Sequence, residues 1–129
     1  MIDHISFNVP PSRYQEIVTF YLAALAPLGY TKQMDISGIA CGIGDSPSNA
    51  RFWLGQFEDI AKHITGIFHL AFMAKSRDVV DRFHQEAIKA GGKDNGEPGI
   101  RSKYHANYYA AFVVDPLGNN IEVVIHTPE

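Results

Sequence analysis

Three side chains of types that bind metal ions occupy matched positions along this chain. His4 and His69 each lie near the start of a segment in which apolar and polar residues alternate, and Glu122 lies in a third such segment. Two imidazoles and one carboxylate on one side of a divalent cation leave its other positions open for water or substrate. Each residue also has a simpler explanation, as a hydrogen-bonded structural histidine or a solvated carboxylate at a strand edge.

The alternating pattern predicts that the three side chains share one kind of face. Alternation with a period of two is typical of a half-buried β-strand. In each segment the phenylalanine or isoleucine side chains point one way, whereas the His or Glu points the other. If the apolar faces pack on helices, His4, His69 and Glu122 project into one concave sheet surface. The segments span residues 3–9, 67–74 and 119–126.

The elements that would position these residues occur twice in the same order. Each half reads as a strand, a helix and three further strands, and the two histidines occupy the same place in each opening strand. Ser12, three residues before Gln15, predicts a capping box for the first helix, and Ser76 predicts a cap for the second. We therefore expect an α+β fold in a single domain, residues 1–129, built from two βαβββ modules at about 1–60 and 66–129.

Composition excludes several classes of function. The formal net charge of −3 gives no reason to expect nucleic-acid binding, and no apolar stretch approaches the roughly 20 residues that cross a bilayer. The single cysteine, Cys41, cannot form an internal disulfide and is expected to be a small apolar strand residue. The N-terminus does not resemble a signal peptide, so we expect a cytoplasmic protein.

A second group of polar and aromatic residues crowds the segment before the last two strands. Cations there could hold an anionic group, phenols could donate hydrogen bonds, and His105 could carry a proton near neutral pH. The alternative is a polar loop with two aromatic residues buried beneath it. Trp53, in the first module, is expected either to line the cleft or to pack in the core. The segment contains Arg101, Lys103, Tyr104, His105, Tyr108 and Tyr109.

The chain resembles the vicinal-oxygen-chelate superfamily, which includes glyoxalase-type lyases, bleomycin resistance proteins, fosfomycin-modifying transferases and extradiol dioxygenases. The opening residues 2–9 (IDHISFNV) and above all residues 112–124 (FVVDPLGNNIEVV) carry this resemblance. It implies paired βαβββ modules whose sheets curl into a cleft around a metal, with His4, His69 and Glu122 at the ligand positions.

Departures from the family pattern distinguish among its members. Glyoxalase-type lyases usually carry a second ligand Glu in the last strand of the first module, but residues 51–56 contain no carboxylate, and Gln56 is a poor substitute. Bleomycin-sequestering members generally lack the ligand set that is present here.

The extradiol dioxygenase signature is matched in part. In those enzymes a His serves as an acid/base group and a Tyr precedes the Asp-Pro pair, whereas Phe112 stands at that Tyr position here. Tyr108 or Tyr109 could supply the missing hydroxyl. The matching residues are His105, Asp115, Pro116, Gly118 and Glu122.

The resemblance predicts a metal-dependent enzyme, dioxygenase-like or lyase/isomerase-like, that acts on a small oxygen-bearing molecule by bidentate chelation. The metal would be Fe, Mn, Zn or Ni, and the protein a homodimer. The catalytic candidates are His105 and Tyr108, and the substrate-binding candidates are Arg101, Tyr104, Tyr109 and Trp53. The rival hypotheses are a non-catalytic protein that sequesters a small molecule and a fosfomycin-type thiol transferase.

Overall fold

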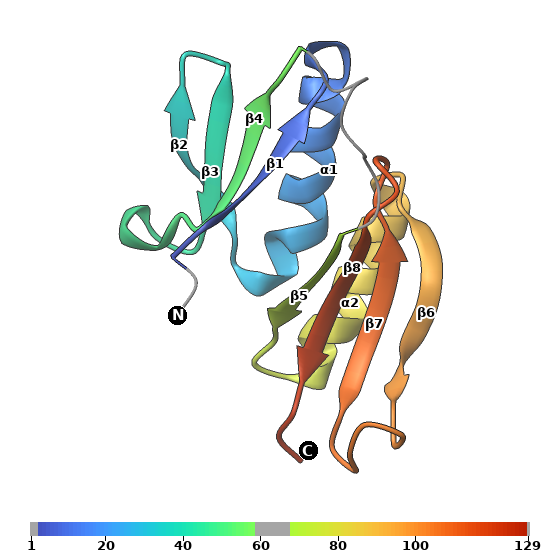
Figure 1. The fold of residues 1–129 in the computed structure, drawn as a ribbon. Coiled ribbons are helices and arrows are strands. Elements are labelled where there is room, and N and C mark those ends of the chain that lie inside the picture. The colour runs from blue at the N-terminus through green and yellow to red at the C-terminus, as the bar shows by residue number, and fades with distance from the viewer. Residues whose placement is uncertain (1–2, 59–67, 129) are drawn as a thin grey trace.

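Two four-stranded mixed sheets form the framework of the protein (Figure 1). The computed structural model describes residues 3–58 and 68–128. The sheets have the strand orders β1-β4-β3-β2 and β5-β8-β7-β6, so each sheet has one parallel pair at the same place. The first module contains β1 (Ile5–Val9), α1 (Tyr14–Leu25), β2 (Thr31–Ile36), β3 (Ala40–Gly44) and β4 (Phe52–Gln56). The second contains β5 (His69–Met73), α2 (Arg77–Lys89), β6 (Lys93–Ile100), β7 (Tyr109–Val114) and β8 (Asn120–Ile125).

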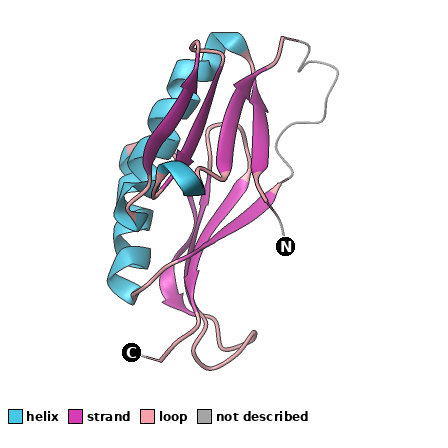
Figure 2. Cartoon of the chain, turned by 90° about the vertical axis from the view of Figure 1, so that its left-hand side faces the viewer, coloured by secondary structure: helices cyan, strands magenta, loops and turns pink. Residues whose placement is uncertain are grey.

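Helices α1 and α2 lie on the same side of the two sheets and pack against each other (Figure 2). They cover the apolar strand faces that the alternation predicted. Phe7 and Val9 are buried, while the intervening Ser6 and Asn8 are exposed. The predicted α+β fold of two βαβββ modules is confirmed. The expected module boundary near residues 60–66 lies outside the described residues.

The start of the first helix differs from the prediction. Pro11–Arg13 form a short 3-10 turn, and α1 begins at Tyr14 without a side-chain cap. The capping box of Ser12 and Gln15 is therefore wrong, because the preceding prolines favour a tight turn and Gln15 lies inside the helix. Ser76 does occupy the N-cap position of α2, but its side chain makes no capping hydrogen bond.

A turn with a buried carboxylate joins β7 to β8. Asp115 Oδ1 accepts hydrogen bonds from the backbone N–H groups of Leu117 and Asn119 at 2.9 and 2.7 Å. Its Oδ2 accepts one from the Tyr21 hydroxyl on α1 at 2.5 Å. The turn of the second module is thus tied to the helix of the first.

Two further expectations concern single features of the chain. Cys41 is buried in β3, as predicted. Within the described residues, no helix is both long and apolar enough to span a membrane.

Candidate functional site

The Glu122 carboxylate is the most deeply buried acidic group on the open face of the second sheet. Its side chain is 2% exposed although it lies on the face of β8 that turns away from the helices. The Tyr108 hydroxyl donates to Glu122 Oε1 at 2.5 Å, and His69 Nε2 lies 3.0 Å from Glu122 Oε2. Burial and the adjacent Glu122 carboxylate raise the pKa of Tyr108 to about 12, so this phenol stays protonated near neutral pH.

Strand register brings His69 and Glu122 together. In the parallel pair of β5 and β8, His69 lies opposite Asn120 and Ala71 lies opposite Glu122. The Asn120 amide nitrogen lies 2.9 Å from His69 Nδ1, and Asn95 donates to the Asn120 amide oxygen at 3.0 Å. As placed, the amide nitrogen donates to Nδ1, so the proton of the neutral imidazole lies on Nε2 and faces Glu122 Oε2. Metal binding at Nε2 requires the Asn120 amide to turn so that its oxygen accepts from Nδ1–H, as an outer-shell partner does.

Two histidines meet beside Tyr108. His105 lies in the loop between β6 and β7, and His126 directly follows β8. Their Nε2 and Nδ1 atoms are 2.9 Å apart, and both rings pack edge-on against the Tyr108 ring at 5.4 and 5.1 Å between centroids. The structure thus places His105 one aromatic ring away from the Glu122 carboxylate.

An aromatic and cationic border surrounds this pair of metal-type ligands. The Phe112 ring stacks on His69 at 6.3 Å, and the Arg101 guanidinium lies 5.5 Å from the Phe112 centroid. The Tyr104 ring lies 4.7 Å from that of Tyr108. The open face of the second sheet therefore gathers six of the predicted site residues. These are His69, Arg101, Tyr104, His105, Tyr108 and Glu122.

His4 is not in contact with this group. It precedes β1 in the first module, and its Nδ1 lies 2.7 Å from the exposed Asp3 carboxylate. Across residues 3–58 and 68–128, no three His, Cys, Asp or Glu side chains are close enough in one chain to hold a metal ion. One chain therefore presents two of the three predicted ligands together and the third elsewhere.

Tyr109 faces the opposite side of the second sheet. Its hydroxyl donates to Asp81 on α2 at 2.7 Å, and the Arg77 guanidinium lies over its ring. Neighbouring residues of a strand point to opposite faces, so Tyr108 and Tyr109 cannot both reach Glu122. We therefore assign Tyr109 to the packing between β7 and α2 and leave it out of the site.

Several solved structures similar to this chain are described as glyoxalase or glyoxalase/bleomycin resistance proteins. No protein-family model matches the sequence, and no curated protein shows significant sequence similarity to it. A glyoxalase/bleomycin resistance protein from Albidiferax ferrireducens is 24% identical, with a TM-score of 0.73 over 98% of each chain. A glyoxalase/bleomycin resistance protein/dioxygenase family enzyme from Burkholderia phytofirmans is 19% identical, with a TM-score of 0.72 over 98% of each chain. A putative glyoxalase from Bacillus halodurans is 26% identical, with a TM-score of 0.68 over 96% of this chain and 94% of that one.

The chain has the glyoxalase/bleomycin resistance/dioxygenase fold. This finding confirms the resemblance at the level of the fold, and the two modules can be compared within it. Ile5 pairs with Phe52 as Leu70 pairs with Ile121, so Ser6 opposite Trp53 is equivalent to Ala71 opposite Glu122. Trp53, and not Gln56, occupies the position in the first module that Glu122 occupies in the second.

Trp53 fits this position because its neighbour is a glycine. A Cβ atom at Gly42 would lie 2.8 Å from the indole ring, closer than real Cβ contacts allow. Trp53 and His4 together line a hollow on the first sheet. In this glyoxalase/dioxygenase fold the first module thus offers one ligand-type side chain and an aromatic surface, instead of a second carboxylate.

Sequence reasoning missed one residue of the site. Asn120 follows the turn at Asn119, and the pairing of β5 with β8 was the signal that could have placed it beside His69. His126 is exposed, and the period of two that places it on the face of Glu122 is readable in the sequence.

Proposed function

We propose that this protein is a divalent-metal-dependent enzyme of the glyoxalase/dioxygenase type that acts on a small oxygen-bearing molecule. The observation that carries the proposal is the burial of Glu122 against His69 Nε2 at 3.0 Å. A buried carboxylate is costly unless cations or hydrogen-bond donors compensate it. Tyr108 compensates Glu122 Oε1, and a metal ion held by Glu122 and His69 would take the place of the direct contact at Oε2, so the two side chains fit the chemistry of a metal site.

The third ligand is His4 from a second copy of the chain. His69 and Glu122 alone leave a metal weakly held, and His4 of the same chain pairs with Asp3 instead. Apolar side chains that a second copy could cover are exposed on both sheets. The exposed fractions are 46% for Met34 and 52% for Ile36 on β2, and 78% for Met73 on β5. A homodimer that joins the first module of one chain to the second module of the other would complete the set.

Tyr108, His105 and Arg101 have roles beside the three proposed metal ligands. The metal would supply Lewis acidity that stabilises negative charge on substrate oxygens. Tyr108 holds the Glu122 carboxylate in place through its hydroxyl, and His105 transfers a proton at the edge of the site. Arg101 attracts an anionic group of the substrate over Phe112.

The nature of the ion distinguishes the reaction classes. Two histidines with one carboxylate suit non-haem Fe²⁺, which together with Mn²⁺ favours oxygenase chemistry, whereas Zn²⁺ or Ni²⁺ favours isomerisation. Trp53 at the position equivalent to Glu122 disfavours a site with two carboxylates.

Calorimetric titration of chelator-stripped protein with Mn²⁺, anaerobic Fe²⁺, Ni²⁺ and Zn²⁺ tests the proposal. We expect one ion per chain in the wild type and no binding in Glu122→Gln, which keeps the shape of the side chain and removes its charge. Glu97→Gln on β6 is the control, because it also removes one carboxylate charge but does not alter a proposed metal ligand. If the wild type binds none of the ions, the enzyme hypothesis fails and a metal-independent sequestering protein replaces it.

Mixed dimers test where His4 acts. Neither His4→Ala nor Glu122→Ala alone should bind the metal. Unfolding and refolding the two variants together should restore one complete site in each mixed dimer, because each chain supplies what the other lacks. Absence of restored binding, in mixtures shown to contain mixed dimers, would mean that the site is formed within one chain.

A further inference from the structure

A second cavity lies between the two modules, on the side of the sheets that faces the helices. It has a volume of about 170 Å³ and is partly open to solvent. A dry cavity of roughly 150 Å³ lined by apolar side chains holds a benzene molecule, so this space accommodates one aromatic ring or a short branched chain. Residues from β3, β4 and β5 contribute to its wall, so it exists only where the modules meet.

Three aromatic side chains make the wall of this junction cavity. Phe72 from the second module meets Phe52 and Tyr30 from the first, at centroid distances of 5.7 and 6.0 Å with interplanar angles of 86° in both cases. Ile43 closes the wall with its side chain fully buried. Tyr30 and Phe72 are only partly buried and can contact a further ring, whereas Phe52 is buried against its neighbours.

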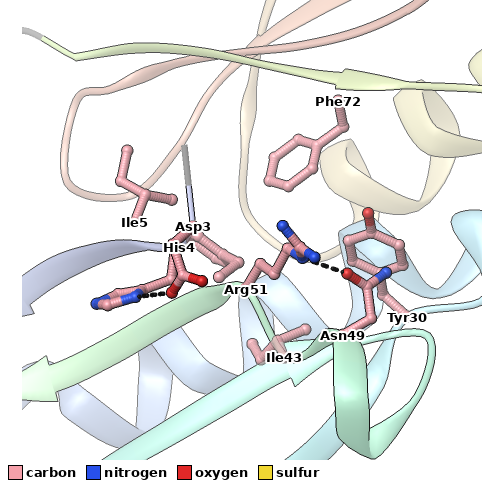
Figure 3. Close-up of a pocket in the computed structure, with 9 residues that line it drawn as sticks. Asp3, His4, Ile5, Tyr30, Ile43, Asn49, Arg51 and Phe72 are labelled. Carbon is pink, nitrogen blue, oxygen red and sulfur yellow. Dashed lines mark hydrogen bonds and ion pairs between the residues drawn. The ribbon is translucent and has the colours of Figure 1, made fainter. Parts of the chain in front are cut away.

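A guanidinium group stands at the mouth of the cavity. In Figure 3, Arg51 lies between Ile43 and Phe72, with its side chain directed into the space that Tyr30 also borders. Its Nε donates to Asn49 Oδ1 at 2.6 Å, which holds the planar group in one orientation. Among the described residues, no other hydrogen bond of the guanidinium is formed, so its two Nη atoms are available for a bidentate pair with a carboxylate.

Asp3 and His4 also line the mouth, so Arg51 already faces one anion, although among the described residues no hydrogen bond joins Arg51 to Asp3. The Asp3 carboxylate is hydrogen-bonded to His4 Nδ1 at 2.7 Å, and in Figure 3 the His4 ring points away from Tyr30 and Phe72. The cavity is therefore separate from the face that carries His69 and Glu122, because Phe72 and His69 point to opposite sides of β5.

We propose that the junction cavity binds a small monocarboxylate with a single aromatic ring or a short branched hydrocarbon tail. The tail lies among Tyr30, Phe52 and Phe72, and the carboxylate pairs with Arg51 at the mouth. Because the ligand contacts both modules, its binding stabilises their packing against each other. His4 borders both this cavity and the proposed metal site, but the ligand of the cavity is not the metal-bound substrate.

Benzoate and 3-methylbutanoate are the probes for this site. Each is titrated into ¹⁵N-labelled, chelator-treated protein, and backbone and arginine Nε–H signals are followed by NMR. We expect saturable shifts at Tyr30, Arg51 and Phe72 for at least one acid. Arg51→Gln should weaken binding by about tenfold or more, since charge-assisted hydrogen bonds of this kind are lost. Benzamide, which has the same ring without the charge, should bind the wild type and Arg51→Gln alike.

The control for lost charge is Arg82→Gln, on the exposed side of α2, which should bind both acids as the wild type does. Two outcomes overturn the proposal: no saturable shift with either acid up to about 10 mM, or shifts confined to the face around Glu122. Titration of the acids into Glu122→Gln separates the two proposals, because this variant should lose metal binding and still bind the acids as the wild type does.

Discussion

At the scale of single residues, the contact between Asn120 and His69 offers the sharpest test of the site. The amide lies at Nδ1 of His69, on the opposite side of the ring from Glu122. Turned so that its oxygen accepts from Nδ1–H, the Asn120 amide is an outer-shell partner of the kind that alters metal affinity by about 10- to 100-fold when it is removed. We therefore expect Asn120→Ala to weaken metal binding within that range while the fold is retained, as measured by calorimetry and circular dichroism.

Asn95→Ala is the matched control. Asn95 contacts the Asn120 amide oxygen and not the imidazole, so its removal should change metal affinity much less. Equal losses in both variants would indicate a general loosening of the β6 edge and would contradict a specific role for Asn120.

Single residues also show what strand register adds to sequence patterns. Alternation alone placed His69 and Glu122 on one face, and their contact follows from the parallel pairing of β5 with β8. Alternation alone could not decide whether Tyr108 or Tyr109 points towards Glu122, because this choice depends on where β7 begins. It also could not pair His105 with His126, since one of them lies in a loop.

At the scale of elements, Tyr21 on α1 and the Asp115 turn form the polar link between the modules. Tyr21 is fully buried, and Tyr21→Phe would leave the Asp115 carboxylate without one of its hydrogen bonds. We expect a loss of about 1–3 kcal/mol in the free energy of unfolding at pH 7, measured by urea denaturation. Thr19→Val on the exposed side of the same helix is the control and should change stability much less.

The same link predicts alkaline destabilisation. Burial, reinforced by the Asp115 carboxylate, raises the pKa of Tyr21 well above its ordinary value. The protonated Tyr21 hydroxyl contributes to the free energy of unfolding. This contribution is fully present below the unfolded-state tyrosine pKa of about 10 and is lost as the pH rises above that value. The free energy of unfolding should therefore fall between about pH 9.5 and 11, with a smaller fall in Tyr21→Phe. Equal slopes in the two proteins would contradict this role of Tyr21.

Close packing between α2 and β7 gives a further prediction. A Cβ atom at Gly92 would lie 2.4 Å from Val113 Cγ1 and 2.9 Å from the Ala87 carbonyl oxygen. Gly92→Ala should therefore destabilise the protein by about 1–3 kcal/mol in urea denaturation. At Gly55 the nearest atom would be 3.9 Å away, so Gly55→Ala should change stability by less than about 0.5 kcal/mol.

Most helices and strands were predictable from sequence, but the bounds of β6 and the pairing of the strands were not. The stripes of α1 and α2 and the alternation of β1, β5 and β8 identified these elements directly. Strand β6 extends over Lys93–Ile100, although this segment (KDNGEPGI) is rich in Gly, Pro, Asp and Asn, which are typical of a loop. Its pairing with β7 tolerates Gly96 and Gly99 through shifts of register, which local composition does not reveal.

At the scale of the whole molecule, the separation of His4 from Glu122 follows from how the modules pack. Repeat symmetry predicts that equivalent residues lie on equivalent faces, but not that those faces meet. The contact of α1 with α2 sets the orientation of the sheets, and it depends on side-chain packing that the alternation pattern does not contain. A second copy of the chain can therefore supply the His4 side chain that the first copy does not bring near its own His69 and Glu122.

This arrangement predicts that dimer formation and metal binding are linked through Met73. Met73 is 78% exposed on β5, an edge strand, and lies on the same face as His69. A buried lysine without a partner is costly, so Met73→Lys should shift the protein to a monomer in sedimentation analysis and abolish tight metal binding. Ile88→Lys, at an exposed position on α2, should leave both unchanged. A monomeric wild type that still binds one ion per chain would contradict the shared site, because a single chain would then have to supply all three ligands.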